Sequence, residues 1–140
     1  MTDGSETTTH RTRVFVADGH ASYRDGMARL LEGHPAVDVV GEAADGTAAL
    51  AGILRLQPDV ALLDVGMAGL SGLEVCRRLR AIGAARRTRV VLITGTPDRD
   101  VTAAAADAGA IALLAKETPP GALVADLVAA GHGRVARAVE

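Results

Sequence analysis

Five short, continuous apolar runs, separated by longer segments with a helical pattern, constrain the fold of this chain more than any other feature. Continuous apolar runs are typical of parallel strands covered on both faces, because a strand with one solvated face alternates instead. Strands and helices that alternate along a chain predict a parallel, doubly wound α/β sheet. The expected strands are 13–17, 37–41, 60–63, 90–93 and 111–115.

The segments between these runs carry local signals for the beginnings and ends of helices. Ser71 can cap a helix that begins at Gly72, Pro97 and Asp98 precede the next helix, and Gly109 ends it. One βα unit therefore follows another along the chain. The expected helices are 22–32, 47–56, 72–82, 99–108 and 122–130.

Composition limits the possible functions. The 140 residues are 49% hydrophobic but include one Phe, one Tyr and no Trp, so the core must be aliphatic. A net charge of −2 gives no general attraction to nucleic acids or anionic membranes, and aromatic platforms for stacking bases are missing. The single cysteine, Cys76, excludes an internal disulfide framework and is expected to pack in the interior.

The two ends of the chain have the character of tails. Residues 1–12 are polar and contain no apolar segment typical of a signal peptide, and no run approaches the length of a membrane span. We therefore expect a cytoplasmic protein with no membrane partner. The expected organisation is a disordered N-terminal tail over 1–12, one folded domain over 13–131, and a C-terminal tail or the start of a linker over 132–140.

Polar residues follow four of the five apolar runs: Asp18, Asp64, Thr94 and Lys116. Lys116 is the only lysine, whereas the other fourteen basic residues are arginine, so this position favours a compact ammonium. In the common five-strand order 2-1-3-4-5, the carboxyl ends of strands 1 and 3 are neighbours and form the ligand crevice. We therefore expect the four side chains to meet at one edge of the sheet.

This combination of side chains suits the transfer of a phosphoryl group to Asp64. A carboxylate can act as a nucleophile and carry the group as a mixed anhydride. The developing charge then needs an ammonium, a hydroxyl and usually Mg²⁺, which keeps several waters and so needs only one or two carboxylates. The alternative is that each residue serves only its own turn or is solvated, which leaves their shared position unexplained.

The order and spacing of five stretches resemble a response-regulator receiver domain, and the resemblance runs from about Arg13 to Ala130. Asp18-Gly19-His20, Arg24 and residues 40–46 resemble in particular the NarL/FixJ-type subfamily of transcriptional regulators. A receiver has the flavodoxin-like fold and is a signalling domain, not an enzyme. The stretches are VADGH at 16–20, VGEAADG at 40–46, LLDVGMAGLSGLE at 62–74, VLITG at 91–95 and LLAK at 113–116.

The resemblance implies a role for each candidate residue. Asp64 would accept the phosphoryl group from a phosphohistidine on a sensor histidine kinase, and Thr94 and Lys116 would contact the phosphoryl oxygens. Asp18, Asp64 and the backbone carbonyl of Gly66 would hold Mg²⁺. Phosphorylation would alter the surface around the last two helices and could act through a homodimer. We expect no nucleic-acid binding by this segment, although relatives carry a helix-turn-helix output domain after the receiver.

Departures from the family pattern concern the same pocket. Gly19 stands where receivers have a second acid, normally the direct metal ligand, so we expect weaker Mg²⁺ binding and slower phosphorylation. His20 is not expected to replace that acid, because Mg²⁺ prefers oxygen. Leu113 stands where Tyr or Phe is usual, and Ala68 and Glu117 replace common prolines. These departures support an alternative interpretation. The chain would then be an atypical receiver that acts as a phosphorylation-independent dimerisation or ligand-binding module.

Two further features of the sequence are assigned no functional role. The arginines over 77–89 form the one basic cluster, which we interpret as a solvated surface and not as a docking patch. His10, His34 and His132 are scattered without metal-ligand spacing, so no role is assigned to them. A small doubly wound enzyme or flavin binder is supported by fold analogy alone.

Overall fold

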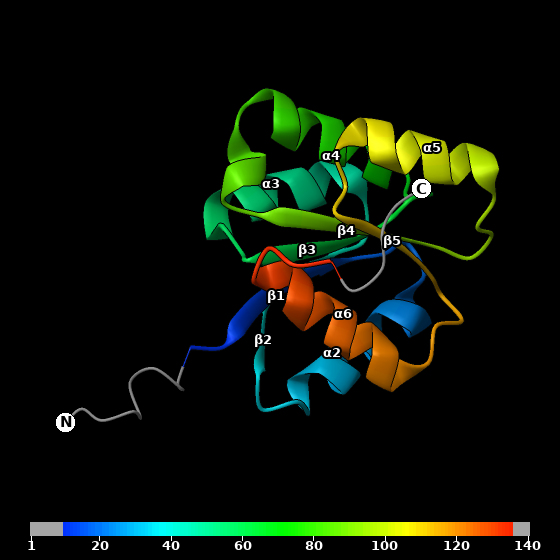
Figure 1. Cartoon of the computed structure of the whole chain (residues 1–140). Helices are drawn as coiled ribbons and strands as arrows, with labels where there is room; N and C mark the ends of the chain where they lie inside the picture. The colour runs from blue at the N-terminus through cyan, green and yellow to red at the C-terminus, as the bar shows by residue number, and fades with distance from the viewer. Residues whose placement is uncertain (1–9, 136–140) are drawn as a thin grey trace.

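The computed structural model describes residues 10–135 and contains one five-stranded parallel sheet. The strand order is β2-β1-β3-β4-β5, which confirms the predicted flavodoxin-like arrangement (Figure 1). The first nine residues of the predicted N-terminal tail and residues 136–140 of the predicted C-terminal tail lie outside the described residues. The strands are β1 (Thr12–Ala17), β2 (Val37–Ala43), β3 (Val60–Asp64), β4 (Arg89–Thr94) and β5 (Ala112–Ala115).

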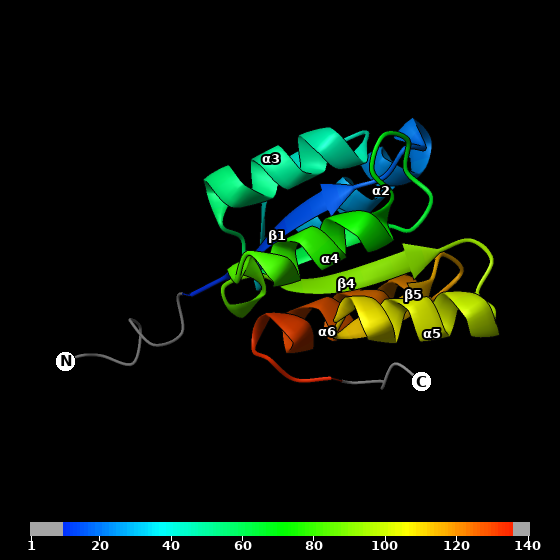
Figure 2. The ribbon, with the colours of Figure 1, turned by 90° about the horizontal axis from the view of Figure 1, so that it is seen from above.

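Helices cover both faces of the sheet. α2 (Ala21–Glu32) and α6 (Pro120–Gly131) lie on one face, and the other three α-helices lie on the opposite face (Figures 1 and 2). Those three are α3 (Gly46–Leu56), α4 (Gly72–Ala81) and α5 (Arg99–Ala108). Each begins at an acidic or hydroxyl side chain that accepts a backbone N–H three residues later, namely Asp45, Ser71 and Asp98.

Several predicted boundaries were wrong by one or two residues. Thr12, assigned to the tail, begins β1 and is buried, and its methyl group would collide with a Cβ at Gly131. α6 begins at Pro120 instead of residue 122, because proline lacks only an N–H that the first helical turn leaves unused. β5 begins at Ala112, and the short 3₁₀ helix Ala84–Arg86 was not predicted.

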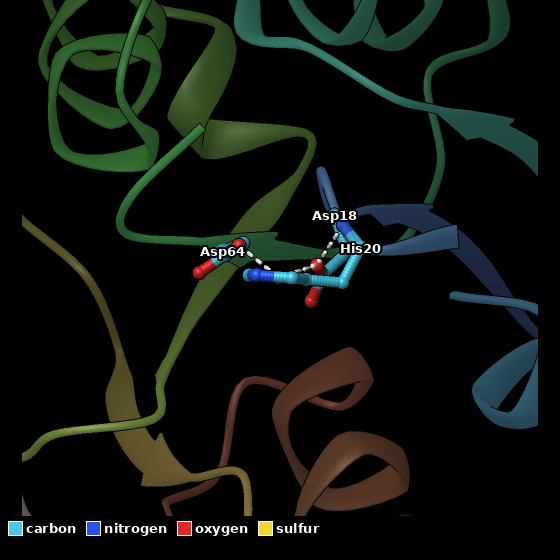
Figure 3. Close-up of side chains that lie close together, drawn as sticks. All are labelled: Asp18, His20 and Asp64. Carbon is cyan, nitrogen blue, oxygen red and sulfur yellow. Dashed lines mark hydrogen bonds and ion pairs between the residues drawn. The ribbon is translucent and has the colours of Figure 1, made fainter. Parts of the chain in front are cut away.

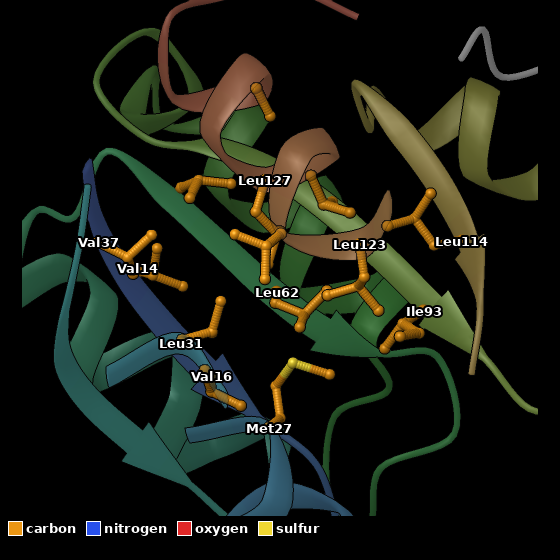
Figure 4. Packing of buried hydrophobic residues seen from close by; sticks show 14 of the residues in the cluster. Val14, Val16, Met27, Leu31, Val37, Leu62, Ile93, Leu114, Leu123 and Leu127 are labelled. Atoms are coloured by element: carbon orange, nitrogen blue, oxygen red, sulfur yellow. The ribbon is translucent and has the colours of Figure 1, made fainter. Parts of the chain in front are cut away.

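Alternation along β1 divides the interior into two aliphatic layers. Val14 and Val16 face α2 and α6, where they join Leu31, Leu123 and other apolar side chains (Figure 4). Phe15 points to the opposite face and belongs to the layer that includes residues of α3, α4 and α5. Because both faces of β1 are covered, its side chains are apolar at consecutive positions, which is the origin of the continuous runs in the sequence.

The single phenylalanine occupies a slot made by two glycines. An added Cβ at Gly41 of β2 or at Gly52 of α3 would lie 2.8 Å or 2.7 Å from the nearest atom of the Phe15 ring. Both contacts are closer than packed carbon atoms allow. The glycines therefore let α3 approach β1 and β2 closely enough to enclose the ring.

The register brings the ends of the strands together. Ala17, the last residue of β1, pairs with Leu63, Asp64 pairs with Ile93, and Thr94 pairs with Ala115. The residue after each of β1 and β5 therefore lies at the same edge of the sheet as Asp64. Among residues 10–135, no helix is long and apolar enough to cross a membrane.

Candidate functional site

Three of the four predicted residues meet through their side chains at this edge. The ammonium Nζ of Lys116 lies 2.7 Å from Oδ2 of Asp18 and 3.6 Å from Oδ2 of Asp64. Both carboxylates are buried, and the Lys116 side chain is 17% exposed. The lone lysine therefore places one positive charge between two buried negative charges, which leaves this group of three with a net charge of −1.

Backbone geometry holds the two acids in place. Asp18 Oδ1 accepts the backbone N–H of His20 at 2.8 Å, and its carbonyl accepts Nη1 of Arg24 at 2.7 Å. Asp64 Oδ1 accepts the backbone N–H of Gly66 at 3.3 Å. The turn after each strand thus fixes its own carboxylate.

Thr94 joins the group through its backbone. Its carbonyl accepts the Lys116 N–H at 2.8 Å, and its buried hydroxyl oxygen accepts the N–H of Thr96 at 3.2 Å. The hydroxyl thus belongs to the turn after β4 in this structure. Leu113 is partly buried and packs in the layer beneath α4 and α5.

Sequence reasoning assigned no site role to two side chains that lie in the pocket. Nδ1 of His20 lies 3.1 Å from Asp18 Oδ1 and 3.8 Å from Asp64 Oδ2 (Figure 3). The same nitrogen lies 3.2 Å from Lys116 Nζ. Lys116 Nζ also lies 4.5 Å from the centre of the Tyr23 ring, within cation–π range. Helical spacing gave no signal for His20, because this residue precedes α2 in an extended conformation.

Burial and charge change the acidity of two pocket groups. Burial alone would raise the pKa of the Asp18 carboxyl, but hydrogen bonds and charge from Lys116, with bonds from His20, outweigh it and hold that pKa below its ordinary value. Burial, with the negative charges of Asp18 and Asp64, raises the pKa of Tyr23 to about 12. Tyr23 is therefore neutral at physiological pH.

We expect Lys116→Met to destabilise the fold by about 2 kcal/mol at pH 7. Breaking a buried ion pair costs about 3–5 kcal/mol, and partial exposure of Lys116 reduces this. The depressed pKa means that ionised Asp18 stabilises the wild-type fold above its unfolded pKa of about 3.9, and that this contribution is lost as the pH falls through the folded value. In Lys116→Met, burial dominates the environment of Asp18, so the pKa of its carboxyl in the folded state rises. Lowering the pH then protonates Asp18 and removes the unpaired buried charge.

The difference in unfolding free energy between wild type and Lys116→Met should therefore shrink as the pH falls from 7 towards 4. Urea denaturation at several pH values measures it. Arg86→Met removes one exposed positive charge outside the pocket and serves as the control. A difference for Lys116→Met that does not change with pH would contradict the assigned pairing with Asp18.

Part of the arginine cluster is paired within the chain. Glu74 pairs with Arg77 and Arg78, Arg87 pairs with Asp59, and Arg80 donates to the carbonyl of Asp107. These contacts agree with the interpretation of the cluster as a solvated surface. They leave the pocket at the ends of β1, β3 and β5 as the candidate site.

The donor set of this pocket fits Mg²⁺. Asp18 and Asp64 provide two carboxylates, and backbone carbonyls and waters can complete an octahedral oxygen shell. Gly19 contributes no side-chain oxygen. Its place has room for one, because an added Cβ would meet only the carbonyl oxygen of Ala44 at an ordinary 3.6 Å.

Comparison with known proteins agrees with the fold of this chain. Residues 14–128 match the response regulator receiver domain family. The chain is 37% identical over 124 residues to the transcriptional regulatory protein NarL of Mycobacterium tuberculosis, covering 89% of this chain and 56% of that protein. The structure of the NarL signal receiver domain superposes with a TM-score of 0.86 at 37% identity, covering 89% of this chain and 99% of that one.

Other relatives join a similar region to a different activity. A protein-glutamate methylesterase/protein-glutamine glutaminase of Myxococcus xanthus is 41% identical over 76% of this chain, which covers 30% of that protein. The chain spans about half the length of NarL and less of the methylesterase. The similarity therefore concerns the receiver portion of both. On the match of its sequence and of its fold, the chain belongs to the response-regulator receiver domain family, in the NarL/FixJ subfamily.

Proposed function

We propose that this receiver accepts a phosphoryl group on Asp64 from a phosphohistidine of a sensor histidine kinase. The observation that carries the proposal is the Lys116 ammonium, held between the buried carboxylates of Asp18 and Asp64 at the carboxyl edge of the sheet. A compact cation at that point can contact a phosphoryl group attached to Asp64 without a change of backbone.

The proposed transfer needs no further reactant. A carboxylate oxygen of Asp64 bonds to phosphorus, the phosphorus–nitrogen bond of the phosphohistidine breaks, and its electron pair returns to the kinase imidazole, which leaves neutral because its other ring nitrogen carries a proton. Lys116 balances charge on one phosphoryl oxygen, and Thr94 offers its hydroxyl to another after leaving the Thr96 N–H. Asp18, Asp64 and the Gly66 carbonyl would hold Mg²⁺, which when bound neutralises charge on the phosphoryl oxygens.

We further propose the cellular setting of a NarL-type regulator. The chain would work in the cytoplasm as a signalling domain without an enzymatic activity of its own. Because the chain spans about half of NarL, a DNA-binding output domain and transcriptional control belong to the proposal for the whole regulator. A homodimer would couple phosphorylation to that output.

Acetyl phosphate with Mg²⁺ tests the chemistry without the kinase. We expect intact-mass spectrometry to show one phosphoryl adduct on the wild-type chain and none on Asp64→Asn, which keeps the shape of the side chain but removes its nucleophile. Asp59→Asn is a matched control, because this partly buried acid precedes β3 at the opposite edge of the sheet and should leave the adduct intact. The absence of an adduct on the wild-type chain at high Mg²⁺ would refute the proposal.

A further inference from the structure

His20 adds an imidazole nitrogen to the two carboxylates of the pocket, and Mg²⁺ does not need a nitrogen ligand. One atom each from Asp18, His20 and Asp64 lies within 4.8 Å of the other two. In Figure 3 the His20 ring extends from the end of β1 towards Asp64 and lies alongside both carboxylates. Asp18 and Asp64 are buried, whereas the His20 side chain is 75% exposed, so a solvated ion can reach the ring from outside.

The direction of this ring is set by the backbone. His20 is the residue before α2, and its own N–H donates to Asp18 Oδ1 at 2.8 Å. Gly19 lies between the two residues and places no side chain in the pocket. The turn that binds the carboxylate of Asp18 therefore also brings Nδ1 of His20 to 3.1 Å from the same oxygen.

The spacing of the three atoms suits a small divalent ion. Nitrogen and oxygen ligands bind Zn²⁺ at about 2.0–2.2 Å, so neighbouring ligand atoms around a tetrahedral ion lie roughly 3.3–3.6 Å apart. The 3.1 Å from His20 Nδ1 to Asp18 Oδ1 is slightly shorter than that. The 3.8 Å from Nδ1 to Asp64 Oδ2 needs only a small movement of the exposed ring.

The position of Lys116 shows that one positive charge can contact all three residues. Its Nζ lies 2.7 Å from Asp18, 3.2 Å from Nδ1 of His20 and 3.6 Å from Asp64, so one positive centre already contacts all three residues. The flexible stem of a lysine can withdraw when an ion with higher charge takes its place.

We propose that Asp18, His20 and Asp64 together bind a first-row transition-metal dication such as Co²⁺ or Zn²⁺ in preference to Mg²⁺. Imidazole suits these ions, whereas Mg²⁺ favours oxygen ligands, and the loss of an acid at position 19 weakens only the oxygen set. The site shares two residues with the proposed phosphoryl acceptor but does not require phosphorylation. A bound transition metal would displace Lys116 from Asp18.

Titration of the metal-free full chain with Co²⁺, followed by its visible absorption, tests the site. We expect one equivalent to bind, Zn²⁺ to displace it, and a hundredfold excess of Mg²⁺ to leave most of it in place. His20→Ala should weaken Co²⁺ binding at least tenfold and change Mg²⁺ affinity, measured by calorimetry, less than twofold. His10→Ala and His34→Ala should bind Co²⁺ like wild type; His10 needs this control because it lies 3.5 Å from Asp59.

Retention of wild-type Co²⁺ affinity by His20→Ala, or displacement of Co²⁺ by modest Mg²⁺, would overturn the inference. Circular dichroism verifies that each variant is folded. The outcome of the acetyl phosphate experiment is independent of this test, because phosphorylation with Mg²⁺ depends on Asp64 and does not depend on a nitrogen ligand.

Discussion

Replacing Gly72 with alanine should lower the free energy of unfolding by about 3 kcal/mol, at the upper end of the usual cost of overpacking. Gly72 is the first residue of α4, and a Cβ there would overlap the backbone carbonyl oxygen of Asp64 and approach Leu92 Cδ2 to 3.2 Å. The Gly72 N–H also donates to the carbonyl of Val65 at 3.1 Å. The helix thus begins in direct contact with the end of β3, where the collision can be relieved only by moving backbone.

Urea denaturation followed by circular dichroism measures this loss. Gly121→Ala is a matched control, because Gly121 lies in the first turn of α6 and an added Cβ would meet no atom within 4 Å. Alanine should therefore leave stability unchanged there or raise it by up to about 1 kcal/mol through its helix propensity. A Gly72→Ala chain as stable as wild type would show that α4 does not rest on β3 as described.

Gly19→Asp should raise Mg²⁺ affinity roughly tenfold or more and accelerate phosphorylation by acetyl phosphate. The substitution adds a carboxylate beside Asp18 and Asp64, and Mg²⁺ binds through carboxylate and water oxygens. Position 19 accepts a side chain, since the nearest atom to an added Cβ is the Ala44 carbonyl oxygen at 3.6 Å. Calorimetry and a time course of intact mass measure the two effects.

Gly19→Ala separates the new ligand from the mere presence of a side chain. It fills the same space without an oxygen, so we expect its Mg²⁺ affinity to equal that of wild type. Equal affinity for Gly19→Asp and Gly19→Ala would mean that the pocket does not bind Mg²⁺ through this position. A large gain would show that the natural sequence has given up part of the metal site that other receivers keep.

The strands and their ends could be predicted because burial on both faces leaves a direct trace in the sequence, whereas the strand order was taken from the common arrangement of five-stranded parallel sheets. Val60 to Leu63 are fully buried and consecutive, so β3 appears as an apolar run and Asp64 marks its end. The position of Lys116 followed from the same reasoning, since it comes directly after β5. Boundaries were less certain, because the apolar pattern continues through Ile111 although pairing within β5 begins at Ala112.

The role of His20 could not be predicted, because it depends on the direction of one side chain. That direction comes from the N–H of His20 bonding to Asp18, a contact across two residues that leaves no periodic signal. Similarly, Thr94 was correctly placed at a strand end, but its hydroxyl accepts the Thr96 N–H in this structure. The hydrophobic pattern of the sequence indicates where a residue lies along a strand. The side-chain torsion angles depend on neighbours that come together only in the folded chain.

Because aromatic residues are scarce, the tyrosine beside the pocket can serve as its intrinsic fluorescent probe. Tyr23 is the only tyrosine in a chain without tryptophan, and its ring lies beneath the Lys116 ammonium. Tyrosine emission from the unmodified protein therefore arises from a single ring, which contacts the charge expected to move. Any event that draws Lys116 towards a phosphoryl group, or that replaces it with a metal ion, should change that emission without a dye or an engineered fluorophore.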